Sequence, residues 1–258
     1  MAFKEKNINY LIISLKILLG LLLLVSLILL KYEPVWFHRN LPENNFVMMT
    51  LTKFVTADCQ KGADCTNSFK VILESSASGV VFLQRDTKSY VLTAEHFCNA
   101  TAAVESSLPY DRIISIIKLQ DLKGRTWDSK ILYYDSQKDL CLLETSMPIE
   151  KNINFAYSMP SHGEKVFAIS APMGLYAKNV SLQFEGLFSG CDENQMCFFT
   201  IPAIGGSSGS LVYDKKGNVI SMIQMAVHNF HTLSMGVGIH DIREFLNNAS
   251  DHLQIDLL

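Results

Sequence analysis

From Ser68 onward, the chain is a succession of short segments rich in β-branched and aromatic residues, separated by turn-forming residues. Such segments are typical of β-strands, because these side chains pack well on a pleated surface. The expected strands are Phe69–Ser75, Gly79–Gln84, Ser89–Thr93, Ile113–Leu119, Thr126–Tyr134, Leu140–Glu144, Lys165–Ser170, Val180–Phe188, Met196–Ile201, Ser210–Tyr213, Val219–Met225 and Leu233–Ile239. Many short strands without alternating helices predict an all-β fold, built as barrels or as a sandwich.

One helix is expected near the C-terminus, over Asp241–Asn247. Asp241 is a suitable N-cap, and Ile242, Phe245 and Leu246 fall on one face of the helix. The cap and the apolar face together predict a short C-terminal helix.

Composition and charge narrow the classes of function. The chain has 258 residues, of which 48% are hydrophobic and 18% are charged, and this argues against a disordered chain. The length suits one substantial domain or two small domains that share a core. The formal net charge is -3 and no basic cluster is present, so nothing favours binding to nucleic acid.

The segment Asn9–Leu30 is apolar over 22 residues and carries a single charge, Lys16. At about 1.5 Å per residue, a helix of this length crosses a hydrocarbon core of roughly 30 Å. We therefore predict an N-terminal transmembrane helix over residues 9–30. An N-terminal tail (1–8) precedes this anchor, and a stalk or linker (31–67) and the folded domain (68–258) follow it.

The alternative is a cleaved signal peptide, with Lys4 and Lys6 as its charged start and Ile17–Leu30 as its apolar core. The residues that follow, Lys31–Trp36, contain no small-x-small cleavage site. They include aromatic residues typical of the membrane interface. A retained anchor is therefore favoured over a cleaved signal.

The positive charges around this segment bear on its orientation. Lys4, Lys6 and Lys16 lie on its N-terminal side, whereas Lys31 and Arg39 follow it. The excess of positive charge before the segment favours a cytoplasmic N-terminus. We therefore predict a single-pass membrane protein whose folded domain lies on the periplasmic or extracellular side.

The cysteines agree with that location. Six are present, namely Cys59, Cys65, Cys98, Cys141, Cys191 and Cys197. The first two and the last two form close pairs, as expected in an oxidising compartment. The gap within each pair is longer than in a zinc knuckle, so a metal site is not predicted. The pairing of the middle two is left open.

Three polar residues stand beside predicted strands in the order His, Asp, Ser. His96 follows the strand that ends at Thr93, Asp139 directly precedes the apolar strand Leu140–Glu144, and Ser208 lies in a loop rich in Gly and Ser. A serine hydroxyl attacks a carbonyl carbon only when a base takes its proton, and imidazole is such a base. A carboxylate on the other ring nitrogen fixes the imidazole tautomer. The three residues therefore predict a catalytic triad for acyl transfer.

The loop around Ser208 suits the oxyanion of such a reaction. Preorganised N–H donors stabilise the oxyanion, and glycine lets the backbone turn these groups inward without the hindrance of a Cβ. Gly206 and Ser208 are therefore the expected donors. Each residue alone is more often structural, so the prediction rests on the whole set. This chemistry requires no cofactor.

Five motifs carry a resemblance to a known family, namely Ser78–Val81, Thr93–His96, Asp139–Leu143, Gly163–Gly174 and Gly206–Gly209. With them the chain resembles the trypsin- and chymotrypsin-like serine peptidases, and is most similar to HtrA-type catalytic domains. The resemblance implies two six-stranded antiparallel barrels with the triad in the cleft between them. It places the nucleophile at Ser208, the third position of G-x-S-G, rather than at Ser207.

The chain also departs from the family pattern. Ser207 replaces the usual Asn or Asp before the nucleophile, and Ser210 replaces the usual second Gly after it. The stretch from the expected helix to Leu258 is too short for a C-terminal PDZ domain. A catalytically silent binding or scaffold protein on the same fold therefore remains an alternative to a membrane-anchored serine endopeptidase. The sequence does not define the oligomeric state.

By the same resemblance, two segments line the pocket for the residue that precedes the cleaved bond (P1). They comprise Pro202, Ala203, Ile204, Gly205, Gln224, Met225, Ala226 and Val227. No acid is among them, so a basic P1 residue lacks a charge partner. We therefore predict protein or peptide substrates with apolar, small-to-medium P1 residues.

Overall fold

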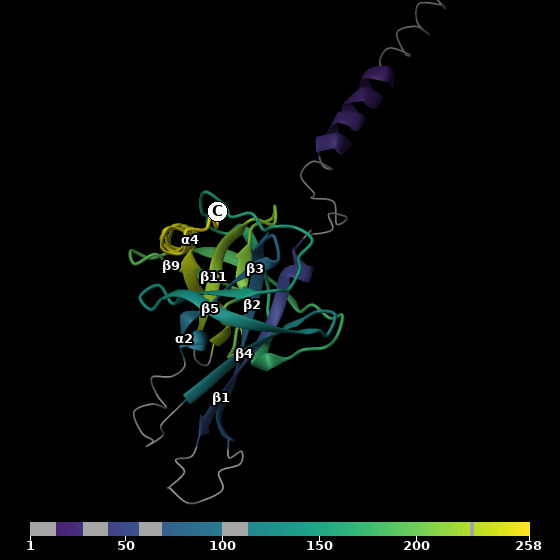
Figure 1. Cartoon of the computed structure of the whole chain (residues 1–258). Helices are drawn as coiled ribbons and strands as arrows, with labels where there is room; N and C mark the ends of the chain where they lie inside the picture. The colour runs from purple at the N-terminus through teal and green to yellow at the C-terminus, as the bar shows by residue number, and fades with distance from the viewer. Residues whose placement is uncertain (1–13, 28–40, 57–68, 100–112, 228–229) are drawn as a thin grey trace, which may run out of the picture. The chain divides into compact units, whose positions relative to one another are not determined.

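The computed structural model describes residues 14–27, 41–56, 69–99, 113–227 and 230–258 (Figure 1). The chain divides into two compact units, Met1–Arg39 and Asn40–Leu258. In the first unit, residues 14–27 are helical. None of the helices in the described ranges is both long and apolar enough to cross a membrane. The anchor predicted over residues 9–30 extends beyond the described residues and stays a prediction.

The described part of the second unit contains two closed barrels of six strands each. The first barrel comprises β1 (Phe46–Thr56), β2 (Phe69–Arg85), β3 (Lys88–Thr93), β4 (Ile113–Asp121), β5 (Thr126–Asp135) and β6 (Leu140–Thr145). The second comprises β7 (Lys165–Ile169), β8 (Gln183–Cys191), β9 (Met196–Phe199), β10 (Leu211–Tyr213), β11 (Val219–Val227) and β12 (Phe230–Gly238).

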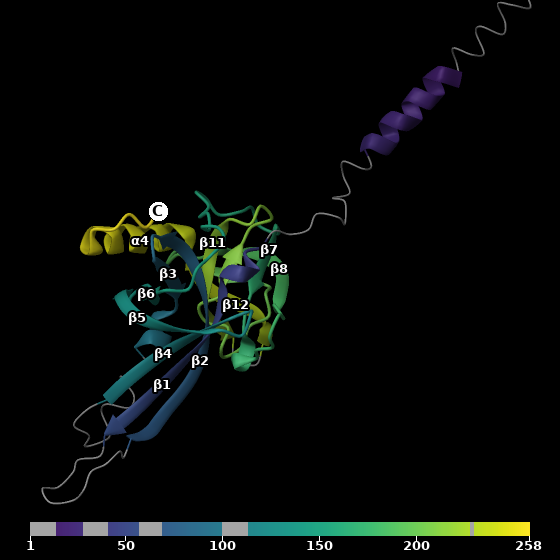
Figure 2. The same cartoon turned by 45° about the vertical axis from the view of Figure 1, so that its right-hand side comes forward.

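Each barrel closes through its own cycle of strands, β1-β2-β3-β6-β5-β4 and β10-β11-β12-β9-β8-β7. All of these strand pairs are antiparallel. Figure 2 shows the two barrels side by side. The all-β architecture with two six-stranded antiparallel barrels is therefore confirmed.

The strand β1 corrects the predicted domain boundary. It lies within residues 31–67, which were predicted as a stalk or linker, so the first barrel begins upstream of residue 68. Its register pairs Val47 with Gly79 on β2 and with Asp121 on β4. These partners are distant in sequence, so the strand is stabilised by pairing that the local pattern does not reveal.

The strand β2 is also longer than expected. It runs without a break through Ser76-Ala77-Ser78, where two shorter strands were predicted. These small residues stay in the ladder because β1 pairs with them, Met48 lying opposite Ser78. Ser78 is fully buried.

The described part of the second unit also contains short helices and one longer helix: η1 (Glu43–Asn45), α2 (Glu95–Cys98), η2 (Pro172–Gly174) and α4 (Ile239–Leu253). The predicted C-terminal helix is confirmed but is longer at both ends. Gly238 is its N-cap instead of Asp241, and Gln254 ends it with a left-handed φ of 56°. The buried Ile239 and Ala249 extend its apolar face beyond the predicted bounds.

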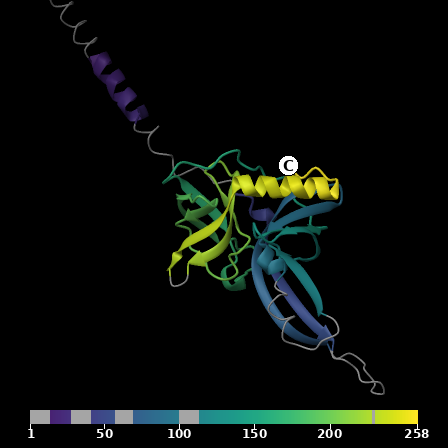
Figure 3. The same ribbon diagram turned by 90° about the vertical axis from the view of Figure 1, so that its left-hand side faces the viewer.

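Three groups of buried apolar side chains hold this unit together. One consists of residues of the first barrel, one of residues of the second, and the third joins both barrels and α4. Successive residues of β1 alternate between groups, with Val47 and Met49 in one and Phe46 and Met48 in the joint group. This alternation follows from the two-residue period of a strand. The helix α4 contacts β5, β11 and β12, so it bridges the two barrels (Figure 3).

Candidate active site

His96 and Asp139 form a close pair at one end of the first barrel. The His96 Nδ1 atom lies 2.8 Å from Asp139 Oδ2, and the His96 backbone N–H donates to Asp139 Oδ1 at 2.8 Å. His96 follows β3 and Asp139 precedes β6. These strands are antiparallel neighbours with Thr93 opposite Cys141. The strand pairing therefore brings together two residues that lie 43 positions apart in sequence.

The imidazole of His96 is a stronger base than usual. The hydrogen bond to Asp139, the charge of that carboxylate and the charge of Glu95 raise the pKa of His96, and they outweigh the opposing effect of burial. Half of the His96 side chain remains exposed. An accessible imidazole with a raised pKa is suited to accept a proton.

The backbone at Asp139 is held in an unusual conformation. Its φ is 51°, a left-handed value that few non-glycine residues adopt without support. Gln224 of β11 supplies that support, because its amide donates to the Lys138 and Asp139 carbonyls at 2.5 and 3.1 Å. Lys138 in turn forms ion pairs with Asp241 and Glu244 of α4 at 3.4 and 2.7 Å. The second barrel and α4 thus hold the segment that carries Asp139.

Ser208 precedes β10 and comes from the other barrel. Its hydroxyl donates to the Gln224 carbonyl at 3.0 Å. Among the described residues, no hydrogen bond joins Ser208 Oγ to His96. Gln224 nevertheless links the two segments, because its backbone carbonyl accepts from Ser208 and its side-chain amide donates to the Asp139 carbonyl.

The loop before Ser208 leaves two N–H groups without an acceptor. Ser207 N–H donates to Ile204 O at 2.9 Å and Gly206 has a φ of 91°, as expected at the third position of a type II turn. A Cβ on Gly206 would lie 2.7 Å from Ala171 O, so glycine is required here. Within the described part of the chain, the N–H groups of Gly206 and Ser208 donate to no protein atom. These are the two donors predicted for an oxyanion hole.

The two departures from the family motif are accommodated differently. Ser207 Oγ accepts a hydrogen bond from Ile204 N–H at 3.3 Å and therefore supports the turn. Ser210 Oγ is buried and has no hydrogen-bond partner among the described residues. Such a group is destabilising by about 1–3 kcal/mol. Among the described residues, neither serine hydroxyl forms a hydrogen bond with His96 or Asp139.

The residues predicted to line the P1 pocket differ in their exposure to solvent. Pro202, Gly205 and Met225 are exposed, Ile204, Ala226 and Val227 are half-buried, and Ala203 and Gln224 are buried. The Gln224 side chain binds the Lys138 and Asp139 carbonyls. The resemblance implied that Gln224 lines the pocket, but it did not indicate this contact with the segment that carries Asp139.

Two disulfides are present among the described residues. Cys191–Cys197, expected from the close spacing, joins β8 to β9. Cys98–Cys141, left open by the sequence, joins the end of α2 to β6 and is buried. Its two cysteines lie two residues after His96 and two residues after Asp139. Residues 57–68, with the pair Cys59 and Cys65, lie outside the described residues.

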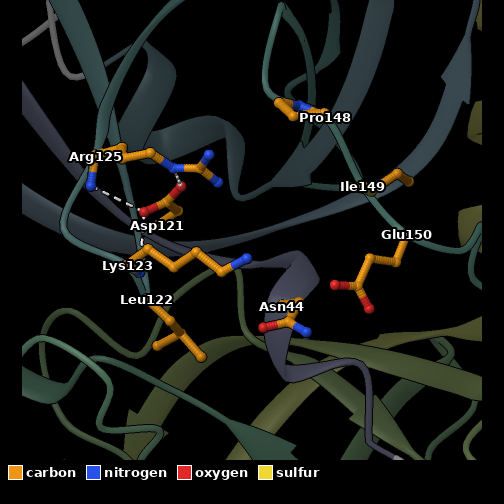
Figure 4. A pocket seen from close by; sticks show the side chains of 8 residues that line it. All are labelled: Asn44, Asp121, Leu122, Lys123, Arg125, Pro148, Ile149 and Glu150. Carbon is orange, nitrogen blue, oxygen red and sulfur yellow. Dashed lines mark hydrogen bonds and ion pairs between the residues drawn. The ribbon is translucent and has the colours of Figure 1, made fainter.

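A separate pocket contains none of these groups. It is lined by Asn44, Asp121, Leu122, Lys123, Arg125, Pro148, Ile149 and Glu150 (Figure 4). Asp121 accepts hydrogen bonds from the backbone of Lys123 and Arg125 and from the side chains of Arg125 and Trp127. The pKa of the Asp121 carboxyl is lower than its usual value. Burial alone would raise this pKa, but the hydrogen bonds from Arg125 and Trp127 and the charge of Arg125 outweigh burial. Asp121 thus stabilises the turn between β4 and β5.

Comparisons with known proteins agree with this fold. Residues 77–222, more than half of the chain, match the family model of the trypsin-like peptidase domain. The serine protease Do-like HtrA of Bacillus subtilis (strain 168) is 25% identical over 211 residues, which cover 76% of this chain and 44% of that protein. The chain therefore spans less than half the length of this curated relative.

A solved structure, an HtrA-type protease with a decapeptide, superposes with a TM-score of 0.61 at 18% identity. The match covers 82% of this chain and 65% of the other, and at this identity it shows the fold alone. The family model together with the two barrels identifies this chain as a member of the trypsin-like peptidase family.

Proposed function

We propose that the chain is a membrane-anchored serine endopeptidase that cleaves peptide bonds with His96, Asp139 and Ser208. The observation that carries the proposal is the pair of N–H groups at Gly206 and Ser208, which lack an acceptor in the described residues beside the candidate nucleophile. The His96–Asp139 contact of 2.8 Å supports it.

In the proposed reaction, Ser208 Oγ turns from the Gln224 carbonyl toward His96 Nε2 and attacks the substrate carbonyl carbon. Its proton passes to Nε2 while Asp139 holds the Nδ1 proton. The negative charge that forms on the carbonyl oxygen is stabilised by the Gly206 and Ser208 N–H groups. His96 then protonates the leaving amine as the C–N bond breaks, which leaves an acyl-enzyme on Ser208. Water gives a proton to His96 and attacks the acyl carbon, the bond to Ser208 Oγ breaks, and His96 returns the proton to Ser208.

Labelling with a peptide phosphonate tests this proposal, because the probe bonds only to an activated serine. We expect the full chain to be labelled and the Ser208→Ala variant not to be labelled. Ser221→Ala is the matched control, since it removes a buried serine hydroxyl of β11 outside this loop and should keep the label. If the folded wild-type protein shows no label that depends on Ser208, a catalytically silent binding or scaffold protein is favoured. The Ser208–Gln224 hydrogen bond is the observation consistent with that alternative.

The pH dependence follows from the raised pKa of His96. The imidazolium cannot accept a proton, so kcat/KM should fall as the pH drops through this pKa. Glu95→Gln removes a charge that raises the pKa, and we expect the acidic limb of the profile to move to lower pH. Glu144→Gln, which changes an acid paired with Lys88, should leave the limb in place. If the acidic limb does not move in Glu95→Gln, the assignment of this limb to His96 is wrong.

Substrate preference follows from the residues proposed to line the pocket. Among Pro202–Gly205 and Gln224–Val227 there is no carboxylate to pair with a basic side chain. We expect cleavage after apolar, small-to-medium P1 residues in a peptide library. Cleavage after Arg or Lys at a comparable kcat/KM would show that the preference is wrong.

Membrane anchoring is proposed from the apolar segment Asn9–Leu30. After carbonate extraction, the full chain should stay with the membrane fraction, whereas Leu21→Arg/Leu24→Arg should release it, since charge at a helix centre opposes insertion. Protease added to intact cells should digest the folded domain if it lies on the extracellular side. If it lies in a periplasm, the outer membrane must first be made permeable to the added protease. A mature N-terminus beyond Leu30 would show a cleaved signal instead.

A further inference from the structure

Ser78 of the first barrel contacts the loop of the candidate nucleophile in the second. Its hydroxyl donates to Gly206 O at 2.9 Å, and its backbone N–H donates to Ser208 O at 2.9 Å. The residue is fully buried. Ser78 therefore holds the carbonyl groups of both residues proposed to supply the oxyanion hole.

The same hydroxyl also contacts a second loop. Ser78 Oγ accepts a hydrogen bond from Ala171 N–H at 2.9 Å. Two residues later, Met173 N–H donates to Gly205 O at 2.6 Å. That carbonyl belongs to the peptide unit that carries the Gly206 N–H. The orientation of this donor thus depends on a loop that Ser78 also holds.

We propose that Ser78 is a positioning residue: from the first barrel it fixes the carbonyl groups of Gly206 and Ser208, and so holds the two residues whose N–H groups, in the adjoining peptide units, stabilise the oxyanion. The inference rests on the proposed function and adds to it a residue that does not touch the substrate.

The local conformations explain why such a contact is needed. Gly206 has a φ of 91°, and Met173 has a φ of 56° within η2. A glycine at the third position of a turn readily exchanges type II for type I geometry, and this exchange turns the central N–H to the other side. A left-handed φ at Met173 persists only when its surroundings hold it. Ser78 bonds to both loops with one hydroxyl, which donates to one and accepts from the other.

Thr93 extends the connection toward the His96 side of the site. Its hydroxyl donates to Ser78 O at 2.8 Å. Thr93 is the last residue of β3, three positions before His96. The backbone of Ser78 is thereby held from the strand that leads to the proposed base.

A purely structural serine would fill a buried position and stabilise the fold without setting catalytic geometry. The two roles differ in what Ser78→Ala changes. Loss of positioning affects an interaction that forms only in the transition state, so kcat and kcat/KM fall together while KM stays unchanged. Removal of a single oxyanion donor typically costs about 10²–10³ in rate. Because Ser78→Ala misaligns the donors without deleting them, we expect kcat to fall by about 10- to 100-fold.

The test measures kcat, KM and the pH profile of the full chain and its Ser78→Ala variant, together with inhibition by a peptide aldehyde. The aldehyde forms an oxyanion with Ser208, so its affinity should fall by about the same factor as kcat. The pH at which the acidic limb falls should stay unchanged, because the His96–Asp139 contact is not altered.

Ser221→Ala is the matched control. Ser221 is a fully buried serine of β11 whose hydroxyl donates to Val237 O at 2.7 Å. We expect this variant to lose stability in urea unfolding and to keep its kcat. If Ser78→Ala does not fold, Ser78→Cys is measured instead, since it fills the site but forms weaker hydrogen bonds. It should show an intermediate loss of kcat.

The outcomes separate the inference from the proposed function. An active wild type with a selective fall of kcat in the Ser78 variant supports the inference. An active wild type whose Ser78 variant keeps its kcat, changes only KM, or behaves like Ser221→Ala overturns it. A wild type without Ser208-dependent labelling overturns the proposed function, and the inference falls with it.

Discussion

Replacing Asp139 by Asn should lower kcat by about four orders of magnitude at neutral pH, the loss typical of this substitution in a Ser-His-Asp triad. The His96 backbone N–H donates to Asp139 Oδ1, so the oxygen of an Asn side chain should remain there. The Asn amide group then faces His96 Nδ1, which must act as an acceptor. The imidazole proton is thereby placed on Nε2, where it prevents proton transfer from Ser208.

The measurement is kcat and KM on a peptide substrate, with phosphonate labelling to count competent sites. Asp135→Asn is the matched control, since Asp135 Oδ1 accepts from Gln137 and Lys138 N–H in the same turn and an Asn oxygen can replace it. We expect Asp135→Asn to keep its kcat. If Asp139→Asn retains more than a tenth of wild-type kcat, the assigned role of Asp139 is wrong.

Removal of the Cys98–Cys141 disulfide should destabilise the second unit strongly. The bond spans 43 residues, and chain-entropy reasoning for such a loop gives about 4 kcal/mol of unfolding free energy. The Cys191–Cys197 bond spans 6 residues, for which the same relation gives about 2 kcal/mol. The double variant Cys98→Ala/Cys141→Ala should therefore unfold at a lower urea concentration than Cys191→Ala/Cys197→Ala.

The two double variants should also differ in activity. The first bond lies beside the His96–Asp139 contact, whereas the second joins β8 to β9 in the other barrel. We expect kcat to fall in Cys98→Ala/Cys141→Ala under conditions where both variants are folded. Urea unfolding curves and kcat at low urea measure the two effects. Equal destabilisation by the two removals would count against the loop-entropy argument.

The sequence predicts the fold well where the information is local or where motifs recur. The strand β3 and the apolar strand β6 follow from their composition, and the sequence places His96 after the first and Asp139 directly before the second. That the two strands are neighbours is a finding of the structure. The strand β1 was missed because its pairing with β2 and β4 joins residues far apart in sequence. Strand pairing of this kind depends on tertiary contacts more than on local propensity.

In the candidate site, too, the sequence predicts local features but not long-range contacts. The oxyanion donors at Gly206 and Ser208 follow from the chemistry of a glycine-containing loop. The contacts of Gln224 do not, because a strand assignment leaves the reach of a long side chain undefined. The Cys98–Cys141 bond was equally inaccessible, since disulfide connectivity cannot be deduced from spacing alone. Ser78 was recognised only as part of a motif, and its contacts come from the docking of two barrels.

The division of the site between two barrels has a consequence for biosynthesis. His96 and Asp139 are carried by the first barrel, whereas Ser208 and its N–H donors belong to the second. N-terminal parts of a chain emerge and fold first during synthesis. A nascent chain that has completed only its first barrel has a base and an acid but no nucleophile. The proposed activity therefore requires the whole second unit, because β11 and α4 also hold the segment that carries Asp139.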